Sequence, residues 1–328
     1  MARQPAVTAE TVGAFADTFE AILSNIAKVI QGKEEPTRLA LVCLFSEGHL
    51  LLEDVPGVGK TTLAKAIARS FDLEGRRIQF TPDLLPSDVT GASIYDRDAK
   101  SFSFRPGAVF ANVLLADEIN RASPKTQAAL LEAMQERQVT IDNVSHPLPH
   151  PFLVIATQNP VEYEGTYPLP ESQLDRFLLR VKMGYPDRGA EMAMLDVHAH
   201  DEGSLGDLPV VAPSGTIPDM IAMAERTHVA GALKGYMVDL ATATRTHPAL
   251  ALGMSPRAVL ALQRASRTLA ASVGREYVIP DDIKAIFGCA VEHRMVLSAE
   301  AVVSGVEMAE VVADVLRMVP VPSGRPGT

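Results

Sequence analysis

One stretch of the sequence decides the fold: Asp54-Val55-Pro56-Gly57-Val58-Gly59-Lys60-Thr61-Thr62. A short apolar run, His49–Leu52, precedes it, and a helical apolar pattern, Thr61–Phe71, follows it. This order of strand, loop and helix is the context in which a phosphate-binding loop occurs. Gly57 and Gly59 leave room for successive backbone N–H groups to wrap around phosphates, and the start of the helix adds partial positive charge. The stretch therefore predicts a nucleotide site.

The loop assigns roles to two side chains. Lys60 is placed to neutralise the β- and γ-phosphates of a bound nucleotide, and the Thr61 hydroxyl is placed to ligate Mg²⁺. One position departs from the general pattern, which begins with Gly where this chain has Asp54. Asp adopts unusual backbone angles more readily than most residues, so the loop can still form. The alternative, a glycine-rich turn without a ligand, leaves the flanking strand and helix unexplained.

A second motif places two carboxylates at the end of a strand. The apolar run Val113–Ala116 is followed directly by Asp117 and Glu118. Parallel strands deliver their carboxyl ends to one edge of a sheet, so this pair is expected beside the phosphate loop. Asp117 is then placed to hold Mg²⁺ with its water shell, and Glu118 to orient and polarise the attacking water. An acidic pair alone could simply cap the next helix. With the loop upstream, it predicts hydrolysis of the bound nucleotide.

Strands alternate with helices only in the first part of the chain. A third continuous apolar run, Phe152–Ala156, is typical of a strand buried on both faces. Helical patterns surround the three strands at Phe15–Ile30, Glu35–Phe45, Thr61–Phe71 and Pro124–Arg137. This alternation predicts an α/β domain, residues 1–187, with a parallel sheet covered by helices.

The pattern changes after residue 187. Residues 201–218 are rich in Gly, Pro, Ser and Asp and indicate a linker or long loop. The helical patterns that follow are Ile217–His228, Lys234–Thr246, Pro256–Val273, Pro280–Val296 and Ala299–Met318. We therefore expect a second, all-helical domain at residues 188–328.

Composition narrows the class of protein. The chain has 328 residues, enough for two domains, with 47% apolar and 21% charged residues, as in ordinary globular proteins. A net charge of -10 argues against a general nucleic-acid binder. Cys43 and Cys289 sit among apolar residues and are interpreted as buried thiols of a reducing compartment. Neither a signal peptide nor an apolar run of the ~20 residues that a membrane span needs is evident, which predicts a cytoplasmic protein without membrane insertion.

Several longer motifs resemble one family. They are Gln79–Asp88 (QFTPDLLPSD), Asp117–Ala122 (DEINRA), Ala156–Pro160 (ATQNP), Thr166–Glu171, Leu174–Phe177, Gly253–Ala258 and Gly274–Val278. Together they resemble the MoxR family of AAA+ ATPases, in the clade with an insert in the second helix, over roughly Phe15 to Leu316. The resemblance implies a P-loop AAA+ sheet flanked by helices with a C-terminal helical lid. It also implies that Asp54 is a variant which the family accepts.

The resemblance implies roles for three further residues. Asn159 resembles sensor 1, Arg176 the arginine finger that reaches a neighbouring subunit's ATP, and Arg257 sensor 2. Without the family, an Asn-Pro turn and a surface ion pair are the more common explanations of the first two. Arg257 follows an N-cap Ser and a Pro, in a first helical turn where a cation opposes the helix dipole. Helix stability therefore does not explain it; whether it acts in its own or a neighbouring subunit stays open.

Two inserted segments indicate which kind of partner the protein acts on. Thr81–Gly107 resembles the insert of the clade and is expected as a looping segment, and Gln138–His150 resembles the hairpin before sensor 1. Gln138–His150 contains no Lys or Arg, which makes a poor track for nucleic-acid phosphates. The family implies an ATP- and Mg²⁺-dependent ring, a hexamer, that acts as a chaperone on protein partners, one class being proteins with a von Willebrand factor A domain. Alternatives are a magnesium-chelatase ATPase subunit, a DNA-acting motor and a P-loop small-molecule kinase.

Overall fold

The structure is a computed structural model that describes residues 8–53, 58–98, 100–159, 166–185, 188–189, 191–192 and 205–322. The chain folds into two compact units, each of which is described by itself. The α/β unit comprises Ala21–Phe177 and Val181–Pro218. The helical unit comprises the described residues up to Glu20, Leu178–Arg180, and the chain from Asp219 onward. The predicted division into two consecutive domains at residue 187 stays a prediction.

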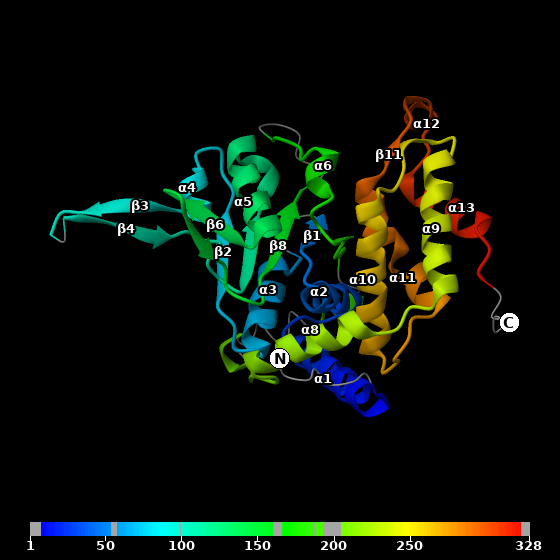
Figure 1. Ribbon diagram of the computed structural model, residues 1–328, viewed down its shortest axis with the longest axis horizontal. Helices are drawn as coiled ribbons and strands as arrows, with labels where there is room; N and C mark the ends of the chain where they lie inside the picture. The colour runs from blue at the N-terminus through cyan, green and yellow to red at the C-terminus, as the bar shows by residue number, and fades with distance from the viewer. Residues whose placement is uncertain are drawn as a thin grey trace. The chain divides into compact units, whose positions relative to one another are not determined.

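Four strands of a five-stranded sheet form the centre of the α/β unit; the order of the whole sheet is β2-β5-β8-β1-β9. Figure 1 labels β2, β8 and β1 of this sheet. The strands are β1 (Leu50–Glu53), β2 (Gly75–Gln79), β5 (Val113–Asp117), β8 (Leu153–Gln158) and β9 (Leu179–Val181). β2, β5, β8 and β1 pair in parallel. The three inner strands of this order are the three apolar runs that the sequence predicted. They are buried because helices cover both faces of the sheet.

Alternate residues of the strands pack against different helices. On one face, Leu114 and Ala116 of β5 join a core cluster with Leu130 and Met134 of α5 (Pro124–Glu136). The other helices of this unit include α2 (Glu34–Phe45), α3 (Lys60–Ser70), the short α4 (Pro86–Thr90) and α6 (Glu171–Leu174), with part of α1 (Ala9–Ala27). Ser123 begins α5 by accepting a hydrogen bond from the Thr126 N–H at 3.4 Å, with Pro124 in the first turn. The sheet thus has the covered faces that its apolar strands require.

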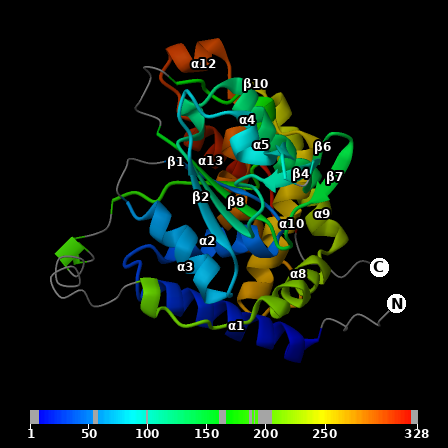
Figure 2. The same ribbon diagram turned by 90° about the vertical axis from the view of Figure 1, so that its left-hand side faces the viewer.

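Two antiparallel ribbons extend from this unit. β3 (Gly91–Asp96) pairs with β4 (Ser101–Pro106) in the ribbon that projects in Figure 1. β6 (Gln138–Ile141) pairs with β7 (Val144–Pro147), and Figure 2 shows both of these strands. The expected hairpin at Gln138–His150 is confirmed. The expectation of a looping segment at Thr81–Gly107 was wrong, because it contains α4 and the β3–β4 ribbon. Alternating side chains on both strands, joined by a polar turn, favour a ribbon over a loop.

The root of the second ribbon is held by charges. Glu47 accepts hydrogen bonds from Arg137 at 2.7 Å and from the ring of His150 at 2.9 Å, on either side of β6 and β7. Burial opposes the charge on Glu47, but the hydrogen bond from His150 and the charge of Arg137 hold the pKa of this carboxyl below its usual value. At the far end, Asp142 and Asn143 both have positive φ, as a two-residue hairpin turn requires.

The helical unit is built from the predicted C-terminal helices. They are α8 (Ile217–Arg226), α9 (Gly231–Thr246), α10 (Pro256–Ser272), α11 (Pro280–Val291), α12 (Ala299–Val303) and α13 (Met308–Met318), with a small ladder of β10 (Leu250–Leu252) and β11 (Val296–Leu297). Predicting one helix at Ala299–Met318 was wrong. Gly305 has φ 74, a left-handed conformation that ends α12, and Glu310 then caps the start of α13 through the Glu307 N–H.

Two smaller points complete the fold. Among the described residues, no helix is both long and apolar enough to cross a membrane. Both cysteines are free thiols, and Cys43 is buried as predicted. Cys289 is only partly buried, so the prediction of two buried thiols was wrong for this residue, which lies next to the core-facing positions of α11.

Candidate nucleotide-binding site

The helix α3 begins at the end of the predicted phosphate loop. Gly59 precedes it with φ 92, in the left-handed region that glycine enters without strain, and a Cβ there would touch nothing within 4 Å. Lys60, Thr61 and Thr62 form the first turn, and the N-cap residue, Gly59, has no side chain with which to cap it. Asp54, Val55, Pro56 and Gly57 lie outside the described residues, and Val58 is buried. The described half of the loop therefore leads into the start of a helix, where backbone N–H groups and the helix dipole favour the binding of phosphate.

The acidic pair lies at the carboxyl end of β5. Asp117 is its last residue, and Glu118 follows in the left-handed conformation with φ 56. A non-glycine residue in this conformation is uncommon and is found where the surrounding structure imposes it. Here the backbone turn separates the two carboxylates, so that each has its own set of hydrogen-bond donors.

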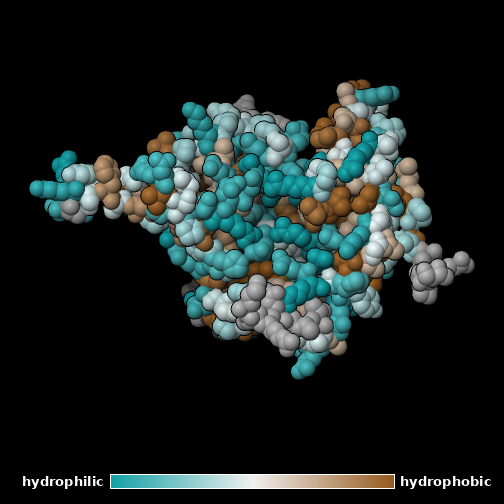
Figure 3. All heavy atoms as spheres, viewed as in Figure 1, coloured by the Kyte–Doolittle hydropathy of each residue, from teal (hydrophilic) through white to brown (hydrophobic). Residues whose placement is uncertain are grey.

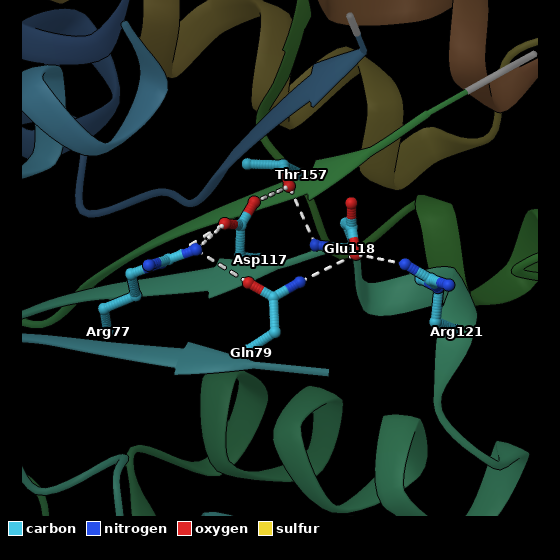
Figure 4. Close-up of polar contacts among 6 residues, drawn as sticks. All are labelled: Arg77, Gln79, Asp117, Glu118, Arg121 and Thr157. Carbon is cyan, nitrogen blue, oxygen red and sulfur yellow. Dashed lines mark hydrogen bonds and ion pairs between the residues drawn. The ribbon is translucent and has the colours of Figure 1, made fainter. Parts of the chain in front are cut away.

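Thr157 joins the two acidic residues. Its buried hydroxyl donates to Asp117 Oδ1 at 2.6 Å and accepts from the Glu118 N–H at 2.8 Å (Figure 4). Thr157 comes from β8, which lies between β5 and β1 in the sheet. The sequence motif Ala156–Pro160 contains this residue, but nothing in the sequence alone indicated that it links the carboxylates.

Two side chains of the edge strand β2 complete the environment of the acids. Arg77 donates to Asp117 Oδ2 from Nε at 3.2 Å and from its terminal nitrogen at 2.7 Å. Gln79 accepts from Arg77 at 2.7 Å and donates to Glu118 Oε2 at 2.7 Å (Figure 4). Arg121 donates to the same Oε2 at 2.9 Å. Sequence reasoning missed Arg77 and Gln79, because β2 is too polar to be recognised as a strand.

The hydrogen bonds determine which oxygens are open to a ligand. A carboxylate oxygen accepts about two hydrogen bonds. Asp117 Oδ2 and Glu118 Oε2 each receive two, while Asp117 Oδ1 receives one. Asp117 can therefore meet a cation or its water through Oδ1, and Glu118 can meet a water through Oε1. The arrangement suits one metal-directed and one water-directed carboxylate.

A buried glutamine holds the turn that follows the acids. Gln127 of α5 donates from Nε2 to the carbonyl oxygens of Ile119, Ala122 and Tyr167, at 3.2, 3.2 and 2.9 Å. The Tyr167 N–H in turn donates to the Asn120 carbonyl at 2.6 Å. Gln127 thus ties the residues after Glu118 to the segment that leads to Arg176.

The remaining predicted site residues lie in different places. Asn159 is buried at the end of β8, two residues after Thr157, at the same sheet edge as the acids. Arg176 follows α6 and is partly exposed, and none of the ion pairs found in the described part of the chain includes it. Arg257 is exposed in the first turn of α10 in the helical unit. As predicted, Ser255 caps this helix, accepting from the Ala258 N–H at 3.1 Å.

The bridging hydroxyl makes a first prediction. Thr157→Val keeps the shape of the side chain but leaves Asp117 Oδ1 and the Glu118 N–H without their buried partner. We expect a loss of about 1–3 kcal/mol in the free energy of unfolding, measured by chemical denaturation. Thr157→Ser, which keeps the hydroxyl, is the control and should lose much less. Equal stabilities for the two variants would show that the bridge contributes nothing.

A parallel sheet that brings a glycine-preceded helix start and two strand-end carboxylates to one edge defines the P-loop nucleoside triphosphatases. Residues 49–179 match the family described as "ATPase family associated with various cellular activities (AAA)", and residues 242–315 match the "AAA lid domain". The chain is therefore a P-loop ATP hydrolase of the AAA class.

The relatives narrow the class further. The chain is 46% identical to YeaC of Bacillus subtilis over 92% of this chain and 94% of the relative. It is 41% identical to the chaperone MoxR1 of Mycobacterium tuberculosis, over 96% of this chain and 85% of that protein, and 33% identical to MoxR of Methylorubrum extorquens, over 90% and 91%. A crystal structure described as an ATPase of Cytophaga hutchinsonii has a TM-score of 0.89 and 35% identity, covering 96% of this chain and 98% of its own. The chain belongs to the MoxR family of AAA ATPases.

Proposed function

We propose that this ATPase is a ring motor, a hexamer of identical subunits, that remodels or matures protein partners. The observation that carries the proposal is the acidic pair, bridged by Thr157 and set at the same sheet edge as the start of α3. This arrangement separates a metal-directed carboxylate from a water-directed one, as hydrolysis of ATP requires. The name of the relative MoxR1, a chaperone, supports the remodelling role.

Within one subunit the roles follow from position. Residues Asp54–Thr62 hold the phosphates, with Lys60 neutralising their charge. Asn159 and Glu118 orient the attacking water, and Glu118 draws its proton. Thr61 and Asp117 provide the protein oxygens for Mg²⁺, an ion that commonly binds through few protein ligands and the nucleotide's own phosphates. The described residues contain no cluster of three metal-ligating side chains, which fits an ion held largely by the nucleotide.

We propose that a neighbouring subunit completes the site. Arg176 is partly exposed and stands outside the ion pairs of the described chain, so its guanidinium is available to another molecule. An arginine supplied in this way stabilises charge on the transferring phosphoryl group. Arg257 is proposed as a second such arginine, of its own or a neighbouring subunit.

Two further features support the proposed kind of partner and the proposed cellular compartment. Gln138–His150 contains no Lys or Arg, which disfavours the alternative of a DNA-acting motor. A protein client is therefore proposed, one class being proteins with a von Willebrand factor A domain. Free thiols at Cys43 and Cys289 suit a reducing compartment, and we propose that the protein works in the cytoplasm.

The nucleotide assignment is tested at Lys60. Lys60→Ala removes the positive charge from the phosphates, so binding of a fluorescent ATP analogue is expected to fall by about a hundredfold. Lys65→Ala changes an exposed lysine one turn further along α3 and should bind as the wild type does. Unchanged affinity in Lys60→Ala would refute the assignment of the loop.

A further inference from the structure

The two ribbons of the α/β unit line an open groove. Its volume is about 600 Å³, within the range of ligand-binding clefts. Its lining comes from both ribbons: Ser93, Phe102, Phe104, Ile141, Asp142, Val144 and His146. None of these residues takes part in the nucleotide site described above.

One face of the projecting ribbon is aromatic. Cross-strand pairing sets Ser93 opposite Phe104 and Tyr95 opposite Phe102, so these four side chains share a face. Phe102 is 71% exposed and meets Tyr95 edge-on, with ring centroids 5.2 Å apart. Figure 3 shows apolar atoms among polar ones on this projecting part of the surface. An aromatic side chain this exposed gains little from burial in the fold, and contiguous exposed apolar surfaces commonly mark binding sites.

The other ribbon holds the floor of the groove in place. His146 stacks on Phe104, with centroids 3.9 Å apart and planes at 15°. Phe104 also meets Phe110 at 5.3 Å, so its ring is held from two sides. Phe102, by contrast, meets the edge of Tyr95 and remains largely exposed. The site therefore combines a rigid floor with one exposed aromatic contact.

The charged side chain that lines the groove indicates which kind of ligand the groove favours. Asp142, at the turn of the second ribbon, is the only carboxylate among the lining residues, and they include no Lys or Arg. Aromatic rings beside a carboxylate favour a cation, both by direct attraction and through the negative faces of the rings. Each ribbon has only two strands, so its outer edges offer unpaired backbone groups along which an extended chain can lie.

We propose that this groove binds an extended segment of a client protein in which aromatic or aliphatic side chains alternate with Lys or Arg. The inference rests on the proposed function, because it names the part of the client that the motor engages. The apolar side chain packs against Phe102 and Phe104, while the basic neighbour faces Asp142. A second copy of this chain, or an acidic peptide, is the competing occupant.

The test uses three labelled peptides of eight residues and equal length, which alternate Lys with Phe, Glu with Phe, and Lys with Ser. Binding to the full chain is followed by fluorescence anisotropy without nucleotide. The Lys–Phe peptide should bind most tightly. Phe102→Ser should weaken it by about tenfold or more, since most of the apolar contact is lost. Asp142→Asn should reduce the preference for the Lys–Phe over the Glu–Phe peptide.

Matched controls separate this site from general stickiness and from the motor itself. Val303→Ser removes an apolar side chain that is 89% exposed in the helical unit, and it should bind the Lys–Phe peptide as the wild type does. Neither Phe102→Ser nor Val303→Ser should alter ATP turnover measured without peptide. If the wild-type chain showed no ATP turnover, the proposed function would be refuted, whereas the groove is judged by peptide binding alone. Three results would overturn the proposal. The first is that the three peptides bind equally well, and the second is that Phe102→Ser binds the Lys–Phe peptide as tightly as the wild type does. The third result is that no peptide binds and that the chain self-associates through a contact that Phe102→Ser abolishes.

Discussion

Glu118→Gln is expected to bind ATP with wild-type affinity and to hydrolyse it about 10²–10⁴ times more slowly, the usual contribution of a general base. The substitution preserves shape, and the new amide oxygen can still accept the hydrogen bonds that Gln79 and Arg121 now donate to Oε2. An amide cannot take the proton of the attacking water. The measurement pairs steady-state phosphate release with equilibrium binding of a fluorescent ATP analogue.

The matched control is Glu132→Gln, which neutralises an exposed glutamate on α5. It should hydrolyse ATP at the wild-type rate. Rapid turnover by Glu118→Gln would mean that another group activates the water. The assignment of Asp117 to the metal ion and of Glu118 to the water would then be wrong.

Arg176→Ala is expected to lose about 10³–10⁵ in turnover, the size of the effect that an arginine finger has on phosphoryl transfer. Because the residue is proposed to act on a neighbour's nucleotide, ATP binding by the isolated subunit should change little. Turnover per subunit is measured against protein concentration for both proteins. In the wild type it should rise as subunits associate, whereas in Arg176→Ala it should stay low throughout.

The control for this prediction is Arg97→Ala, at the exposed tip of the β3–β4 ribbon. It removes the same charged group from a place unconnected with the nucleotide site, so its turnover should follow that of the wild type. A wild-type rate in Arg176→Ala, or a rate independent of concentration in the wild type, argues for a site contained within one subunit.

The central strands were predictable for a physical reason. β1, β5 and β8 are covered on both faces, so their sequences are continuously apolar and stand out from the polar turns around them. β2 lies at the edge of the same sheet and has exposed arginines, so its sequence has no such signature. The ribbon in Thr81–Gly107 was missed for a related reason, since its pairing is local and its side chains are largely exposed.

The residues of the nucleotide site also fall into those that the sequence predicted and those that it did not. Asp117 and Glu118 could be predicted because a strand end and a phosphate loop imply a shared edge of the sheet. The contacts of Thr157, Arg77 and Gln79 depend on which strands are neighbours and on their register, in which Gln79 lies opposite Asp117. Strand order in a sheet is a long-range property of the fold, and local residue patterns do not contain it.

In the helical unit, the spacing of apolar residues did not predict the break between α12 and α13. The apolar spacing across Ala299–Met318 continues through the break, so the pattern alone indicates one helix. The left-handed backbone at Gly305 interrupts it, and the side chain of Glu310 begins the next helix. A glycine followed by capping residues was the available signal.

The most direct test of the account mixes the two inactive variants, Arg176→Ala and Glu118→Gln, in equal amounts and measures ATP turnover. If neighbouring subunits complete each site, an Arg176→Ala subunit contributes an intact Glu118 and an adjacent Glu118→Gln subunit contributes an intact Arg176. Random mixing in a closed ring then restores turnover to about a quarter of the wild-type rate. Turnover that remains at the level of the separate variants would contradict the shared site, and with it the ring motor.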